Sequence, residues 1–155
     1  MKRRWWLLAL LLSFTLLPLS ARAYVGVNQG LVSSGVEVGY MTRLVEQNLS
    51  LSLPLLSGDL TTAMASVNVA WRIQRFNPLV IGLGLAGRVA WRGSEGYIPA
   101  LGFLFSLSWE TLGKGEVLFI EGSYMPFMTE EGSPLGGVAT QQVGQWLRIG
   151  WRHLF

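Results

Sequence analysis

The segment LVIGLGLAGRVAW, from Leu79 to Trp91, places large apolar residues at alternate positions, with small or polar residues between them. A period of two is typical of a β-strand with two different faces, because successive side chains of a strand point to opposite sides. Similar alternation, strong or weak, marks seven further segments: Tyr24–Gly30, Gly35–Leu44, 49–55, 63–73, 101–109, Glu116–Met125 and Val143–Phe155. Turn-forming Gly, Ser, Asn, Asp and Pro residues separate the segments, so the sequence predicts eight strands joined by hairpins.

Small residues dominate the second face of these strands. A soluble sheet carries long polar side chains on its wet face, whereas the second face here is mainly Gly, Ala and Ser. Such residues suit a cramped interior and leave the large apolar side chains pointing outward. An apolar outer face and an even number of strands of about 9 to 13 residues predict an all-β fold, an eight-stranded antiparallel up-and-down transmembrane β-barrel.

The first 23 residues have the layout of a bacterial secretory signal peptide. Lys2, Arg3 and Arg4 precede the apolar stretch Trp5–Leu19, and Ala21-Arg22-Ala23 forms a small-x-small cleavage site. The apolar stretch is about 15 residues long, whereas a spanning helix needs about 20. We therefore expect cleavage before Tyr24, so that residues 1–23 are removed and residues 24–155 form the barrel.

Cleavage changes the charge balance of the chain. It removes four of the 12 Lys and Arg residues and leaves eight basic against nine acidic side chains. The basic character of the full chain therefore belongs to the export signal and does not indicate binding to nucleic acid. The absence of cysteine excludes disulfides, thiol nucleophiles and zinc sites of the CxxC type.

Charged residues avoid the apolar face in this register. We expect eight of them to line the lumen: Glu37, Arg43, Arg72, Arg88, Glu110, Glu121, Arg148 and Arg152. The other nine are assigned to turns or strand ends: Glu46, Asp59, Arg75, Arg92, Glu95, Lys114, Glu116, Glu130 and Glu131. Inward Arg would then outnumber inward Glu, and no charge would face lipid, where an Arg or Lys at the bilayer midplane costs about 2–4 kcal/mol.

Aromatic residues are expected near both ends of the barrel. If the first strand starts on the periplasmic side, Trp71, Trp109 and Trp151 lie near the inner interface, and Trp91 and Tyr124 lie near the outer one. Two such girdles at headgroup depth are typical of outer-membrane barrels. The same topology puts short turns at one end and the longer 92–98 and 128–142 loops at the other, and the 128–142 loop is the expected surface for a partner.

The chain ends LRIGWRHLF, with Leu147, Ile149, Trp151 and Phe155 at alternate positions. This ending resembles the C-terminal signature of outer-membrane proteins, the strand that the barrel-assembly machinery reads. His153 departs from the signature, which usually has an apolar or aromatic residue at that place.

The segment from about Val67 to Pro126 resembles, more loosely, the YfaZ-like outer-membrane proteins. The likeness rests on Gly82-Leu-Gly84-Leu, on Gly96-Tyr97 and on the run from Glu121 to Pro126. It covers less than half of the expected mature chain. The resemblance implies an outer-membrane barrel and no particular activity.

Three patterns could carry chemistry, and each has a simpler interpretation. Gly82-x-Gly84-x-x-Gly87 matches the dinucleotide-binding pattern, but it lies inside an alternating segment with no helix after it. His153, the only histidine, is expected at the inner rim, whereas a lipid A deacylase or acyltransferase needs its base near the outer leaflet. The inward Glu residues could act as glycosidase-like acids, but inward Arg residues favour an interior salt-bridge network.

The sequence therefore predicts a non-enzymatic outer-membrane barrel with a structural, envelope or surface-interaction role. No catalytic residue, cofactor or metal is expected. The expected partners are outer-membrane lipid and lipopolysaccharide, with the barrel-assembly machinery and periplasmic chaperones during biogenesis, and the expected state is a monomer. A pore is not expected, because eight strands enclose a space that side chains fill.

Two alternatives stay open at this point. One is a soluble secreted β-barrel that binds a small apolar ligand, which would turn Arg72 and Arg88 outward. The other is a lipid A-modifying barrel enzyme.

Overall fold

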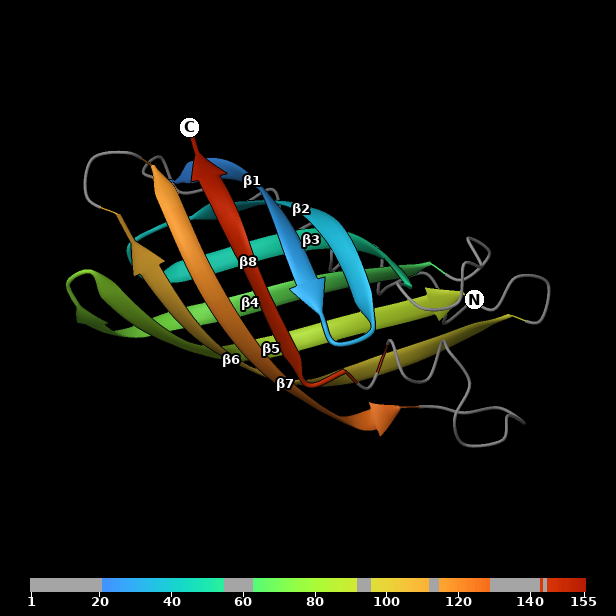
Figure 1. Cartoon of the computed structure of the whole chain (residues 1–155). Helices are drawn as coiled ribbons and strands as arrows, with labels where there is room; N and C mark the ends of the chain where they lie inside the picture. The colour runs from blue at the N-terminus through green and yellow to red at the C-terminus, as the bar shows by residue number, and fades with distance from the viewer. Residues whose placement is uncertain (1–20, 55–62, 92–95, 112–114, 129–142, 144) are drawn as a thin grey trace.

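The computed structural model of the chain describes residues 21–54, 63–91, 96–111, 115–128, 143 and 145–155. These residues form eight strands: β1 (Arg22–Gly30), β2 (Ser33–Met41), β3 (Val45–Pro54), β4 (Met64–Phe76), β5 (Leu79–Trp91), β6 (Tyr97–Glu110), β7 (Glu116–Met128) and β8 (Leu147–Leu154). Each strand pairs antiparallel with the next, and β8 closes the barrel on β1 (Figure 1). The predicted all-β, eight-stranded, antiparallel up-and-down barrel is confirmed. Within the described parts of the chain, no helix is long and apolar enough to cross a membrane.

The second hairpin turns earlier than the sequence analysis expected. The turn expected between the segments Gly35–Leu44 and 49–55, at residues 46–48, lies instead at 42–44. Thr42 organises it through both its backbone and its side chain. The backbone N of Thr42 donates to the Val45 carbonyl oxygen over 2.8 Å, and its Oγ1 accepts from the backbone N of Leu44 and of Val45 at 3.2 and 2.9 Å. A hydroxyl that bonds the backbone two or three residues on is a known turn-forming device. As a result β3 begins at Val45, four residues before the expected segment.

The longest strands belong to one side of the barrel. β4 to β7 have 13 or 14 residues each, whereas β1, β2, β3 and β8 have 8 to 10. β4 runs on to Phe76 through an irregularity between Arg72 and Gln74, and β6 begins at Tyr97, opposite Trp91. These extensions were missed because their residues do not alternate cleanly. β8 begins at Leu147 rather than at Val143.

Most polar and charged side chains of the strands lie inside the barrel, together with a few large apolar ones such as Tyr24, Met64 and Phe119, and the outside is mainly large and apolar. The buried polar residues come from every strand: Asn28, Ser33, Glu37, Glu46, Asn48, Ser50, Ser52, Ser66, Asn68, Arg88, Ser106, Ser108, Glu121, Arg148 and Arg152. The outer wall carries exposed Val, Leu, Ile and aromatic residues, among them Val36, Leu51, Leu85, Phe103 and Ile120. This distribution is the reverse of a soluble domain, in which apolar side chains gather inside.

Glycines make room for larger side chains inside the barrel. A Cβ on Gly150 of β8 would clash with the Phe119 ring and with the backbone oxygen of Val27. A Cβ on Gly84 of β5 would clash with the backbone of Val69 on β4. Gly82, Gly84 and Gly87, which match the dinucleotide-binding pattern, all lie within β5. Their spacing therefore reflects packing in a strand and forms no loop before a helix.

Candidate functional site

The centre of the lumen is an ion-pair cluster around Arg152 of β8. The Arg152 guanidinium lies 2.5 Å from Glu37 Oε1 on β2, 2.7 Å from Glu46 Oε1 on β3 and 2.7 Å from Glu121 Oε1 on β7. All four side chains are at least 96% buried. One arginine thus joins carboxylates from three strands.

Two aromatic rings complete the surroundings of Arg152. Its guanidinium carbon lies 3.6 Å from the centroid of Phe119 and 5.1 Å from that of Tyr24. The Tyr24 hydroxyl donates to Glu46 Oε1 over 3.4 Å. A cation over a desolvated aromatic face gains electrostatic energy, so the rings and carboxylates together offset the cost of burying the charge.

Arg148 extends the network one step further along β8. It donates from Nη2 to Glu121 Oε2 over 2.5 Å, and its Nη1 lies 3.3 Å from Ser50 Oγ and 3.4 Å from Ser66 Oγ. The two hydroxyls are also hydrogen-bonded to each other at 2.6 Å. Glu121 therefore shares its two oxygens between Arg148 and Arg152.

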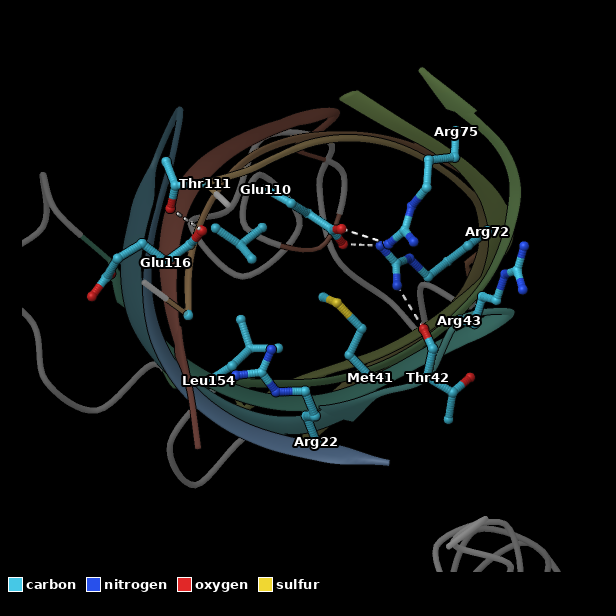
Figure 2. A pocket seen from close by; sticks show the side chains of 12 residues that line it. Arg22, Met41, Thr42, Arg43, Arg72, Arg75, Glu110, Thr111, Glu116 and Leu154 are labelled. Carbon is cyan, nitrogen blue, oxygen red and sulfur yellow. Dashed lines mark hydrogen bonds and ion pairs between the residues drawn. The ribbon is translucent and has the colours of Figure 1, made fainter. Parts of the chain in front are cut away.

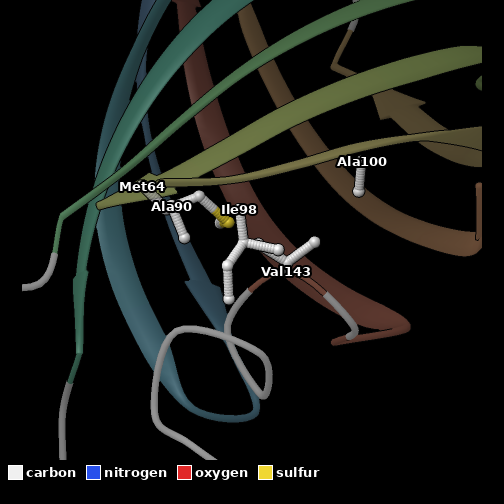
Figure 3. Packing of buried hydrophobic residues seen from close by; sticks show 5 residues of the cluster. All are labelled: Met64, Ala90, Ile98, Ala100 and Val143. Atoms are coloured by element: carbon white, nitrogen blue, oxygen red, sulfur yellow. The ribbon is translucent and has the colours of Figure 1, made fainter. Parts of the chain in front are cut away.

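Arg88 of β5 lies nearer the far end of the lumen and has no carboxylate partner among the described residues. Its Nη1 donates to the carbonyl oxygens of Val143 and Gln145, both at 2.7 Å, and its Nη2 donates to Ser123 Oγ at 2.5 Å. Val143 is fully buried and packs with Met64, Ala90, Ile98 and Ala100 (Figure 3). Arg88 thus ties the residues before β8 to the inner wall.

The opposite end of the barrel opens into a vestibule of about 400 Å³. Figure 2 looks into this opening, with Arg72 and Arg75 reaching from β4 toward Glu110 on β6. Arg72 is ion-paired to Glu110 and also donates to the Thr42 carbonyl oxygen over 2.6 Å, and Arg75 Nη2 lies 2.6 Å from Glu110 Oε2. The start of β1, the 42–44 turn and the neighbouring ends of β4, β6, β7 and β8 line the vestibule.

The structure corrects two of the assignments made from sequence. Arg43 does not lie inside the barrel: it belongs to the 42–44 turn, is exposed, and lies at the rim of the vestibule (Figure 2). Glu46, assigned to a turn, is 3% exposed inside the barrel and binds Arg152. Both errors follow from the misplaced turn: β2 ends at Met41, before Arg43, and β3 begins at Val45, so that Glu46 belongs to the strand.

The inward charges therefore balance, contrary to the expected excess of Arg. Among the described residues, four arginines and four glutamates point inward: Arg72, Arg88, Arg148 and Arg152, and Glu37, Glu46, Glu110 and Glu121. Glu46 could have been found from its place in the alternating series with Asn48, Ser50 and Ser52. The assigned charges at Asp59, Arg92, Glu95, Lys114, Glu130 and Glu131, and most of the 128–142 loop, lie outside the described residues.

The aromatic residues predicted for the interfaces all lie on the outer wall. Their exposed fractions are 51% for Trp71, 42% for Trp91, 49% for Trp109, 70% for Tyr124 and 37% for Trp151. Trp109 and Trp151 lie near the ends of β6 and β8 at the vestibule, and Trp71 pairs with Val45 at the start of β3. Trp91 ends β5 at the opposite end, opposite Tyr97.

The residues of the C-terminal pattern also face outward. Ile149 and Phe155 are 49% and 69% exposed, and Leu147 begins β8. His153 lies on the same side, between the rings of Trp151 and Phe155, and its Nδ1 is 2.9 Å from Glu116 Oε1. The imidazole is therefore an outer-wall group and does not contribute to the lumen network.

Within the described residues, no group of three His, Cys, Asp or Glu side chains is arranged to hold a metal ion. The fold and the lumen define the class of this protein as a closed eight-stranded β-barrel with a polar interior filled by ion pairs. No protein-family model matches the chain, and no curated protein is significantly similar to it in sequence.

Proposed function

We propose that the protein is a bacterial outer-membrane β-barrel that is not an enzyme and has a structural, envelope or surface-interaction role. The observation that carries this proposal is the reversed distribution of side chains, with apolar residues outside and ion pairs inside. Large exposed apolar surfaces are rare on soluble monomers, whereas a lipid bilayer makes such a surface favourable. A closed barrel also leaves no strand edge unpaired in lipid.

The charge pattern of the outer wall supports the same proposal. Within the described strands, the outward charged side chains lie near the strand ends, as Glu116 does beside His153. The outward-facing residues midway along β3, β5 and β6 are Val, Leu, Ile and Phe. A charge at that depth would cost about 2–4 kcal/mol in a bilayer.

A filled lumen favours a structural role over that of a pore. Arg152, Arg148 and their carboxylates cross the interior from β2, β3, β7 and β8, with exposed fractions of a few per cent or less. Eight-stranded barrels enclose a space about as wide as side chains can fill. The barrel would therefore present its surface and loops to partners without conducting solutes.

The N-terminal signal pattern and the alternating C-terminal strand add to the proposal. They imply export, passage by periplasmic chaperones and insertion by the barrel-assembly machinery. In the membrane the neighbours would be outer-membrane phospholipid and lipopolysaccharide.

Fractionation combined with gel mobility tests the proposal. We expect the protein in the outer-membrane fraction, with a folded form that migrates faster on a denaturing gel until the sample is boiled. A soluble periplasmic pool without a mobility shift would contradict the proposal.

A pair of cysteine variants separates this proposal from a soluble ligand-binding barrel. That alternative turns Arg88 outward, but Arg88 is 2% exposed and Ala86 is fully buried inside. Because the chain has no cysteine, Ala86→Cys and Leu85→Cys report on opposite faces of β5. In membranes we expect neither cysteine to react with a membrane-impermeant maleimide, with Leu85→Cys becoming reactive only when the lipid is replaced by detergent. Labelling of Leu85→Cys in untreated cell fractions would argue for a soluble barrel.

A further inference from the structure

Two buried guanidinium groups, those of Arg88 on β5 and Arg148 on β8, approach each other beyond Arg152, on the side away from the vestibule. Arg148 lies 3.4 Å from Ser66 Oγ, and Ser66 is the residue paired directly with Arg88 between β4 and β5. On β7, Arg88 donates to Ser123 and Arg148 donates to Glu121. These two acceptors are two residues apart and lie on the same face of the strand. Both arginines are therefore framed by the same positions of β4 and β7.

The buried charges balance over the lumen as a whole, but they are unevenly placed, and Arg88 has no carboxylate beside it among the described residues. Both oxygens of Glu121 are already engaged, one by Arg148 and the other by Arg152. The acceptors around Arg88 are two backbone carbonyls and a hydroxyl, which are all neutral. An uncompensated buried charge is strongly unfavourable, and nothing among the described residues neutralises Arg88.

Hydrogen-bond donors without an acceptor gather in the same region. The Nε atoms of Arg88 and Arg148 are buried and have no partner, and neither has the hydroxyl of Ser52. Ser52 lies on the same face of β3 as Ser50, which is 3.3 Å from Arg148. Gln145 Oε1, on the residue whose carbonyl binds Arg88, is also buried and has no partner among the described residues. Because buried donors in proteins nearly always have a partner, the donors of Arg88, Arg148 and Ser52 point to an acceptor beyond those that the described residues supply.

We propose that the protein binds a small monovalent anion, such as chloride, between Arg88 and Arg148. An anion accepts from guanidinium and hydroxyl donors and also places a negative charge beside Arg88. A water molecule would satisfy the same donors but would leave the charge uncompensated. This inference goes beyond the proposed function and does not depend on the membrane in which the barrel resides.

Chloride nuclear magnetic resonance on the detergent-folded protein tests the inference. We expect the folded wild type to broaden the chloride-35 line beyond a protein-free micelle control, and bromide to reverse the excess broadening by competition. Arg88→Lys keeps the charge but removes the guanidinium Nε, so the excess broadening should fall severalfold. Arg43→Lys, a change at an exposed arginine in the 42–44 turn, is the matched control and should behave as the wild type does.

A second variant keeps the test decisive even where Arg88→Lys fails to fold. Ser66→Asp supplies a carboxylate of the chain at the point that both arginines approach. We expect Ser66→Asp to abolish the excess broadening. In the wild type, chloride should raise the heat resistance of the folded gel band above that in gluconate at equal ionic strength. In Ser66→Asp, the heat resistance should be the same in both salts. Absence of excess broadening in the folded wild type, or equal broadening in Ser66→Asp, would overturn the inference.

Discussion

Replacing Arg152 with Met removes the cation that joins β8 to three other strands. Glu37 and Glu46 then lose the cation partner that the described residues supply, while Glu121 keeps Arg148. The remaining neutral partners are weak, since Tyr24 reaches Glu46 at 3.4 Å and Asn28 reaches Glu37 at 3.1 Å. The variant therefore leaves two buried carboxylates without charge compensation.

Removing one partner of a buried ion pair typically costs about 3–5 kcal/mol, because the other charge stays buried and unpaired. With two carboxylates orphaned by Arg152→Met, we expect the loss of unfolding free energy to reach at least that range. A loss of about 3 kcal/mol changes the ratio of folded to unfolded protein by roughly a hundredfold. Met keeps a similar length of apolar side chain against Phe119, so the loss should report mainly on charge.

Urea titration of the protein folded in detergent micelles measures this loss through the fraction of the fast-migrating gel band. Arg43→Met, at an exposed turn residue, is the matched control and should stay within about 0.5 kcal/mol of the wild type. Adding Glu37→Gln and Glu46→Gln to Arg152→Met should recover part of the stability, because the unpaired charges are then gone. An Arg152→Met midpoint equal to that of the control would refute the view that this cluster stabilises barrel closure.

Three further predictions concern the two faces of the wall and the end of the chain. Leu85→Arg, at the middle of β5 on the outer wall, should cost about 2–4 kcal/mol in lipid vesicles, and a stability equal to that of Leu85→Ala in a urea titration would argue against lipid contact there. Gly150→Val should lower the yield of the folded gel band, because the new side chain meets the Phe119 ring, and Phe119→Leu should restore part of that yield; no loss with Gly150→Val would contradict the packing described. Deleting Phe155 should sharply reduce outer-membrane assembly in cells, with His153→Ala as the control, and an unchanged barrel yield by gel mobility would count against a C-terminal assembly signal.

The alternation of residue types along the sequence predicted most strands of the barrel wall correctly, but it did not predict the position of every hairpin turn. The number of strands, their order and the inward side of β5 follow from alternation that any short segment displays. The turn at 42–44 did not, because Thr42 rather than a Gly or Pro organises it. The misplaced turn then assigned Arg43 to a strand and Glu46 to a turn, although the inward and outward faces of β2 and β3 were expected correctly.

The amino-acid sequence by itself determined that this chain forms eight alternating strands with small and charged residues on one face and large apolar residues on the other. Each of these properties depends on residues close together in the chain. Only the tertiary structure decided which charges meet, because Arg152 binds Glu37 across 115 positions of sequence. That contact exists only after β8 has closed on β1, and the same closure brings Arg88 and Arg148 from opposite walls to one place in the lumen.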